Sequence, residues 1–218
     1  MKKMLLFLLI TFLLLTGCEK KNDISEIEES NYALMKLDNQ KDYVYFETLQ
    51  PITCEVCTDY DLQYAYINLN SDSVANINLE IKNFVNSSYQ GMIFEENQFI
   101  QGRLFHYDSF INENYITLIQ DYTYYIHPHF VDINSRIYVV NRNTGKLASN
   151  EELLKEKEMT EEDLFSFLLE EDLEDSLFVV SILKKEGYQL YFNQKMELVL
   201  RYYERDNDSV IKRELLVR

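Results

Sequence analysis

The sequence predicts an α+β protein: an antiparallel β-sheet meander with helices packed on one face, in two closely joined subdomains. In several segments, aromatic and β-branched residues alternate with polar residues at every second position, which is the pattern of a half-buried strand. Short polar connections join consecutive segments of this kind, which favours antiparallel pairing. Helical periodicity appears between groups of strand segments, and this order of elements is typical of α+β proteins.

The first 17 residues are typical of a bacterial secretion signal. Two lysines precede an apolar run of twelve residues, which is shorter than the roughly 18 to 20 residues that span a bilayer. Leu15-Thr16-Gly17-Cys18 resembles a lipobox, whose cysteine is acylated before cleavage. We therefore expect Cys18 to carry palmitate or a related acyl chain, which holds the chain on the extracellular face of a Gram-positive cell membrane. The alternative is an ordinary signal peptide with a chance cysteine at its end.

The chain from 18 to 218 is strongly acidic. Without the two lysines of the signal it has 19 basic and 37 acidic residues, so its formal charge is 19 − 37 = −18. Such a charge disfavours nucleic acid and anionic lipid as partners. It is expected either to keep a surface protein soluble or to attract cationic partners, such as wall-lytic enzymes, in a salt-dependent way.

Two further cysteines, Cys54 and Cys57, form the motif Cys-Glu-Val-Cys in a chain that we expect to be exported. Disulfides persist outside the cell, so the pair is expected to close a small disulfide loop. The alternative is an envelope thiol-disulfide redox protein. That chemistry favours a helix that starts at the first cysteine, whereas a strand-like segment follows here.

The chain is expected to comprise a signal peptide over 1–17, an acidic flexible tether over 18–42, and two α+β modules over 43–110 and 111–218. In the first module a helix follows Ser71, because apolar residues recur at helical spacing after a Ser-Asp-Ser start that caps the first amides. The strands expected there cover 43–49, 62–69 and 98–107, and the helix covers 71–86.

The second module is expected to begin with two strands and a turn at Asn143-Thr144-Gly145-Lys146. Ser149 and Glu152 have the spacing of a capping box, and Thr160 to Asp163 is an acidic variant of it, so two short helices are predicted. The strands expected in this module cover 115–126, 136–141, 188–192, 198–203 and 210–217, with a further helix over 172–185.

Several of these segments resemble a known family. A tyrosine-rich strand runs into a loop with His127-Pro128, and the turn Thr144-Gly145-Lys146-Leu147 precedes a leucine-rich helical region. On these motifs the chain resembles, over roughly residues 60 to 204, the RsiV-like extracellular domain family, which occurs in a lysozyme-binding anti-sigma factor and beside a polysaccharide deacetylase. The resemblance implies an α+β fold and a binding role. Tyr125 and Ile126 stand where the family has glycines, so ligand residues do not transfer.

Among the residues that carry chemistry, the tyrosines are the most suggestive. Most strand tyrosines are expected to be core or half-buried sheet residues. Tyr122, Tyr124 and Tyr125, with His127, are candidates for an exposed aromatic face that binds a protein or glycan ligand. His127 and His129 flank a proline without a recognisable metal-ligand spacing, and they are expected to be loop histidines. Glycine-rich phosphate loops and nucleophile motifs are absent from the sequence, so no catalytic residue, metal or cofactor is expected.

The sequence therefore predicts a non-catalytic binding module of the cell envelope. Its expected partners are the membrane, through the lipid anchor, and a cationic protein such as lysozyme or wall peptidoglycan. A redox protein that uses Cys54 and Cys57 is the competing hypothesis.

Overall fold

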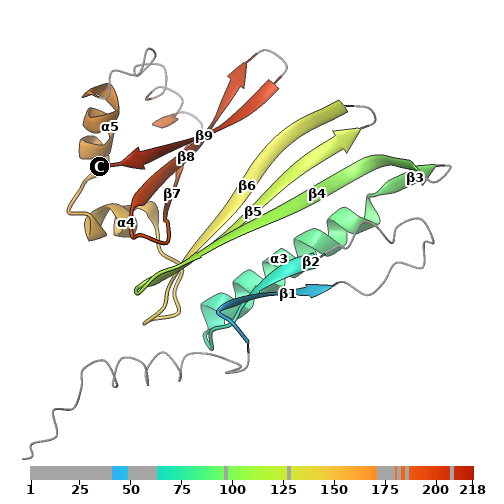
Figure 1. Cartoon of the computed structure of the whole chain (residues 1–218), viewed down its shortest axis with the longest axis horizontal. Coiled ribbons are helices and arrows are strands. Elements are labelled where there is room, and N and C mark those ends of the chain that lie inside the picture. Colours follow the sequence, from blue (N-terminus) through green and yellow to red (C-terminus); the bar gives the residue numbers. More distant parts are fainter. Residues whose placement is uncertain are drawn as a thin grey trace, which may run out of the picture. The chain divides into compact units, whose positions relative to one another are not determined.

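The computed structural model describes residues 41–48, 63–95, 98–126, 129–170, 180, 183–184, 187–206 and 209–218, and Met35–Arg218 forms one compact unit. In the described residues the strands pair antiparallel in three sheets, and the predicted α+β class is confirmed (Figure 1). The strands are β1 (Val44–Thr48) with β2 (Gln63–Ile67); β3 (Ile93–Glu95), β4 (Gln98–Ile111), β5 (Tyr115–Ile126) and β6 (His129–Asn141); and β7 (Gln189–Phe192), β8 (Leu198–Asp206) and β9 (Ser209–Val217).

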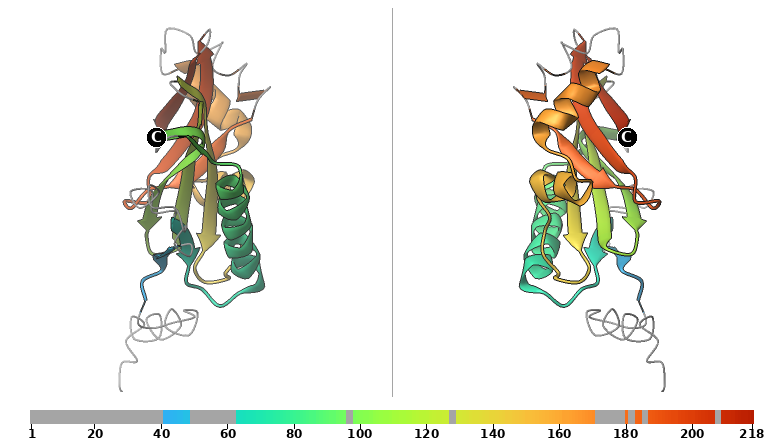
Figure 2. Two further views of the ribbon diagram at one scale, coloured as in Figure 1. Left: turned by 90° about the vertical axis from the view of Figure 1, so that its right-hand side faces the viewer. Right: turned by 90° about the vertical axis from the view of Figure 1, so that its left-hand side faces the viewer.

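The central sheet, β3 to β6, contributes to two hydrophobic cores, one on each face (Figure 2). Because successive side chains of a strand point to opposite faces, β5 supplies both cores. Its residues Ile116 and Leu118 pack with β1, β2 and the helix α3 (Asp72–Gln90). Tyr115 and Ile119 pack with β7, β8 and the two short helices. The division into modules at residue 110 stays a prediction.

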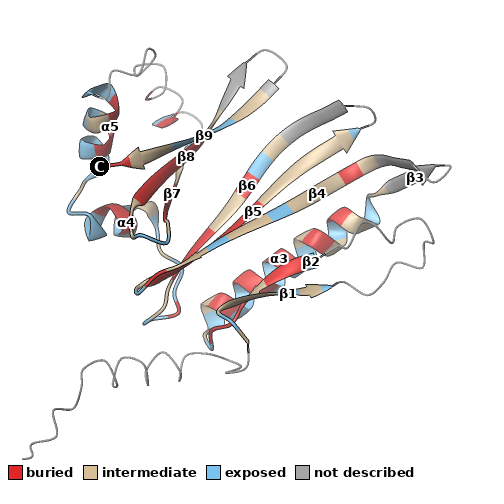
Figure 3. Cartoon of the chain, viewed as in Figure 1, coloured by how far each residue is buried: buried red, intermediate tan, exposed pale blue. Residues whose placement is uncertain are grey.

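Helix α3 begins where the sequence predicts. The Ser71 side chain accepts a hydrogen bond from the Val74 amide at 3.1 Å, and the last turn leads into Gly91. The helix is four residues longer at its C-terminal end than the periodicity indicates. Its buried side faces β2 and the central sheet (Figure 3) and comprises Val74, Ile77, Asn78, Ile81, Val85 and Ser88.

The two short helices α4 (Asn150–Glu156) and α5 (Glu161–Glu170) confirm the capping predictions. Both hydrogen bonds of the capping box are present, since Ser149 Oγ accepts from the Glu152 amide at 3.2 Å and Glu152 Oε2 accepts from the Ser149 amide at 2.7 Å. At α5, Thr160 and Asp163 make the same exchange. Each helix buries two leucines in the core of the β7–β9 sheet, and this burial attaches the helices to the sheet. The leucines are Leu153 and Leu154 in α4, and Leu164 and Leu168 in α5.

The side chain of Asn150 closes the free edge of β7. Its Nδ2 donates to the Tyr188 carbonyl at 3.0 Å, and its Oδ1 accepts from the Leu190 amide at 3.1 Å. A side-chain amide carries one donor side and one acceptor side, so it reproduces the pairing that a neighbouring strand offers. The first residue of α4 is thereby fixed against the sheet.

Several strand boundaries differ from those predicted. The β4 strand continues to Ile111 instead of ending at Tyr107, β6 begins at His129 instead of Arg136, and β8 continues to Asp206. The short β3 strand was not expected. Polar residues such as Asn134 have low strand propensity, but pairing with β5 along its whole length outweighs that preference. The helix expected over 172–185 lies largely outside the described residues. Within the described part of the chain, the helices are too short or too polar to cross a bilayer.

Candidate functional site

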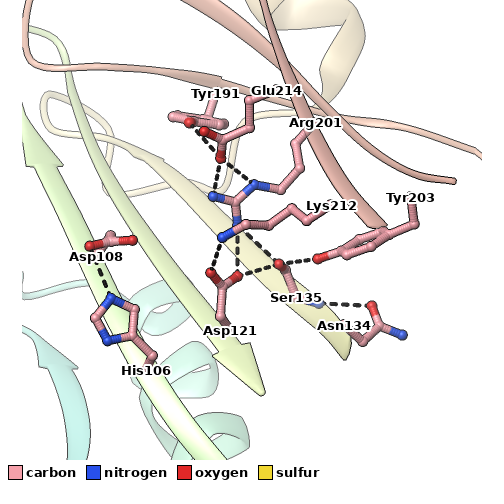
Figure 4. A network of polar contacts seen from close by, with 10 residues as sticks. All are labelled: His106, Asp108, Asp121, Asn134, Ser135, Tyr191, Arg201, Tyr203, Lys212 and Glu214. Atoms are coloured by element: carbon pink, nitrogen blue, oxygen red, sulfur yellow. Dashed lines mark hydrogen bonds and ion pairs between the residues drawn. The ribbon is translucent and has the colours of Figure 1, made fainter. Parts of the chain in front are cut away.

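A partly buried network of charged and polar side chains joins the central sheet to the β7–β9 sheet (Figure 4). At its centre lies Arg201 of β8, whose side chain is only 2% exposed. Its Nη1 donates to Asp121 Oδ1 at 2.7 Å and to Ser135 Oγ at 2.9 Å. Its Nε donates to Glu214 Oε1 at 2.7 Å. Lys212 Nζ donates to Asp121 Oδ2 at 2.7 Å, so both oxygens of this carboxylate are paired.

The register of the strands assembles this network. Asp121 on β5 lies directly opposite Ser135 on β6, and Arg201 on β8 lies opposite Glu214 on β9. Directly opposed residues of an antiparallel pair have neighbouring side chains, so each sheet presents a ready-made pair to the other. Arg201 and Asp121 are 80 positions apart in the chain.

Asp121 and Arg201 each favour the ionised form of the other. Burial acts to raise the pKa of Asp121, but hydrogen bonds from Lys212 and Ser135 and the charge of Arg201 outweigh burial and hold the pKa below its ordinary value. Burial acts to lower the pKa of Arg201, but the hydrogen bond to Glu214 and the charges of both carboxylates raise it. Both groups therefore stay ionised across the physiological pH range.

The network contains a serine, and a histidine lies in the same cross-strand row, yet the order is wrong for nucleophilic catalysis. His106, Asp121 and Ser135 are opposed across β4, β5 and β6, so the aspartate stands between the other two. In a hydrolase triad the histidine stands between serine and aspartate and takes the serine proton. Here Ser135 donates to Asp121, whose lowered pKa makes it a poor base. His106 is 74% exposed, with Nε2 3.4 Å from Asp108 Oδ1.

The predicted ligand tyrosines do not all face the same way. Tyr122 lies on the α3 side of the sheet, and its ring centroid is 5.0 Å from that of Phe84. Tyr124 lies on the same side, accepts a hydrogen bond from Gln101, and has the Arg103 guanidinium 5.7 Å from its ring centroid. The register between β5 and β6 shifts between Tyr124 and Tyr125, but β5 stays in unbroken register with β4, so its alternation places Tyr125 on the opposite face. Tyr122 and Tyr124 are therefore half-buried packing residues beside α3, and their role in binding stays a prediction.

The remaining predicted site residues, Cys18, Cys54, Cys57 and His127, lie outside the described residues. His129 opens β6, and its side chain is not described. Among the residues that the structure describes, no three His, Cys, Asp or Glu side chains come together as a metal site.

Helices α4 and α5 form a strongly acidic surface that the sequence indicates only through its capping residues. Residues 150–170 carry eight carboxylates, all exposed, and two lysines. This surface borders a cavity of about 1000 Å³ between α4, the start of α5 and the segment that leads into β7. The walls of the cavity come from three segments that are separate in the sequence, so no local pattern marks it. The carboxylates are Glu151, Glu152, Glu156, Glu158, Glu161, Glu162, Asp163 and Glu170.

Comparisons with protein-family models, with curated proteins and with solved structures found no match to this chain.

Proposed function

We propose that this chain is a non-catalytic binding protein, anchored to the envelope through Cys18, that captures a cationic protein such as lysozyme. The observation that carries the proposal is the acidic surface of α4 and α5, where eight exposed carboxylates face solvent beside two lysines. A surface of one dominant sign raises the association rate of an oppositely charged protein. The resemblance to a family with a lysozyme-binding member makes lysozyme the first ligand to test.

The polar network supports a binding role in preference to a catalytic one. Arg201 and Asp121 are paired with one another, and Ser135 Oγ accepts a hydrogen bond from Arg201. The exposed imidazole of His106 lies beside Asp108 on its own strand, with Nε2 3.4 Å from Asp108 Oδ1. General acid-base catalysis needs a group whose pKa lies near the working pH, within reach of the substrate. The ionised pair of Asp121 and Arg201 holds two sheets together instead.

Peptidoglycan is the second ligand that we propose, and a separate observation favours it. The cavity beside the acidic helices is lined by Phe165 and Tyr188, whose ring centroids are 6.1 Å apart. Aromatic rings with a polar tip provide contact area for glycan or peptide ligands. The redox alternative at Cys54 and Cys57 stays a prediction from the sequence.

Binding of lysozyme to the detergent-solubilised full chain at low and at moderate salt tests the proposal. We expect binding that weakens steeply as salt rises, because the attraction between exposed charges is screened. The variant Glu151→Gln, Glu158→Gln and Glu162→Gln removes three charges from the acidic surface and should weaken binding at least tenfold.

A matched control removes the same number of charges elsewhere, by Asp42→Asn, Asp72→Asn and Glu113→Gln, all at exposed positions. The control should bind lysozyme nearly as the unmodified chain does. Equal losses in both variants would mean that only the total charge matters, and absence of binding at both salt concentrations would rule out lysozyme as the ligand. Sedimentation of the chain with insoluble peptidoglycan tests the second ligand.

A further inference from the structure

The cavity beside α4 and α5 has walls of mixed character. Its volume of about 1000 Å³ lies at the upper end of the range for small-molecule sites. Leu154 and Leu183, which are 3% and 2% exposed, form an apolar floor. Phe165 and Tyr188 form an aromatic wall in edge-to-face contact, with an interplanar angle of 75°. A ligand seated here can bury an apolar side chain.

Four charged side chains line the same cavity, two of each sign. Glu151 and Lys155 come from consecutive turns of α4, Glu161 from the first turn of α5, and Lys184 from the segment before β7. The Tyr188 hydroxyl donates to Glu161 Oε1 at 2.8 Å and holds this carboxylate at the wall. Lys184 Nζ lies 5.0 Å from the ring centroid of Phe165.

These charges do not neutralise one another. Within the described residues, no ion pair of 4.0 Å or less joins any two of the four side chains, although Glu151 and Lys155 stand one helical turn apart. This contrasts with Arg201, which is paired directly with both Asp121 and Glu214. Both an anion and a cation can therefore find a partner in the cavity without displacing an internal salt bridge.

We propose that this cavity binds a short peptide that has a free ammonium group and a free carboxylate. The ammonium group pairs with Glu151 and Glu161, the carboxylate with Lys155 and Lys184, and an apolar side chain lies against Phe165. A ligand with only positive or only negative charge would face two cavity side chains of its own sign, and this repulsion disfavours both kinds of ligand. A single amino acid fills only a small part of the volume, so a peptide of a few residues fits better. The inference rests on the proposed function for the source of the peptide, which is peptidoglycan.

Calorimetric titration of the full chain with the tripeptide Ala-Leu-Ala tests this inference. The peptide with free ends should bind at least tenfold more tightly than the same peptide acetylated and amidated at its ends, and peptides blocked at one end should fall between. Equal affinity for the free and the doubly blocked peptide would overturn the proposal, because then the charges of the cavity play no part.

Variants locate the site. Lys184→Met and Glu151→Gln should each weaken binding of the free peptide at least fivefold. The matched controls Lys195→Met and Glu113→Gln change exposed charges outside both the cavity lining and the acidic surface, and they should leave the affinity unchanged. Circular dichroism establishes that each variant is folded. Equal weakening in variants and controls would place the peptide elsewhere and overturn the assignment.

Lysozyme binding separates this inference from the proposed function. If the chain binds lysozyme, but its peptide affinity changes neither when the peptide ends are blocked nor in the cavity variants, only the cavity assignment is contradicted. A chain that binds the free peptide but neither lysozyme nor insoluble peptidoglycan contradicts the proposed function and leaves the cavity as a peptide site.

Discussion

Asn78 uses both ends of its side-chain amide on a single residue, Ile67. Its Oδ1 accepts from the Ile67 amide at 2.9 Å, and its Nδ2 donates to the Ile67 carbonyl at 2.9 Å. Both residues are buried, so the two hydrogen bonds that connect helix α3 to strand β2 are shielded from water.

Replacement of Asn78 by alanine should lower the free energy of unfolding by about 3 kcal/mol, because it leaves a buried donor and a buried acceptor of Ile67 unpaired. Urea denaturation measures the loss. Asn83→Ala on the exposed side of the same helix is the control and should change stability by less than about 0.5 kcal/mol. A loss below about 1 kcal/mol for Asn78→Ala would show that Ile67 finds other partners.

Replacement of Asp121 by alanine should destabilise the fold by about 3 kcal/mol at neutral pH, because it leaves the buried Arg201 with one carboxylate instead of two. Asp108→Ala removes an exposed carboxylate from the same face and should have little effect. Urea unfolding of both variants at pH 7 measures the difference, and equal losses would contradict the assigned role of the network.

The same carboxylate predicts a pH dependence. Because the pKa of Asp121 is lowered in the folded state, its ionised form stabilises the fold above the ordinary pKa of about 4. This contribution is lost as the pH falls through the folded-state pKa. The unmodified chain should therefore lose more stability between pH 5 and pH 2 than Asp121→Ala does, as measured by urea midpoints at each pH. Parallel pH profiles would exclude Asp121 as a source of the acid sensitivity.

The capping box of α4 should contribute about 1 kcal/mol. Ser149→Ala removes the acceptor for the Glu152 amide, and the resulting loss at a helix N-terminus is typically of that size. Thermal unfolding by circular dichroism detects it. Ser166→Ala at an exposed position inside α5 removes a hydroxyl without a cap and serves as the control. An equal shift in both variants would mean that the cap is not the cause.

Replacement of Cys18 by serine should abolish incorporation of labelled palmitate and release the chain from the membrane fraction, because the acylated thiol is lost. Cys54→Ser is the control, since it leaves the lipobox intact. Unchanged membrane association of Cys18→Ser would contradict the predicted lipid anchor.

The elements that could be predicted were those that depend on short-range patterns in the sequence. Strand β5 has the predicted ends, and α3 and the capped starts of α4 and α5 follow from short-range patterns. The extension of β6 back to His129 could not be predicted, because its polar residues become a strand only through pairing with β5.

The polar network illustrates what the sequence leaves open. Arg201 was one charged residue among many, and its burial depends on Asp121, which lies 80 positions earlier. Pairs at such a separation form only when two sheets pack, and no local pattern marks them. The alternation of β5 is visible in the sequence and already separates Tyr125 from Tyr122 and Tyr124. The cavity at α4 and α5 depends in the same way on three segments that meet only in the folded chain.

The bonds that Asn150 makes to Tyr188 and Leu190 have a consequence for neighbouring molecules. An unpaired strand edge recruits further strands, and the proposed lipid anchor would bring copies of the chain together on one membrane, where such encounters would be frequent. Because the side-chain amide of Asn150 already occupies that edge, an approaching β-strand cannot form the hydrogen bonds that would stabilise its docking there. One side chain thus protects this edge of the β7–β9 sheet against pairing with a second copy of the chain.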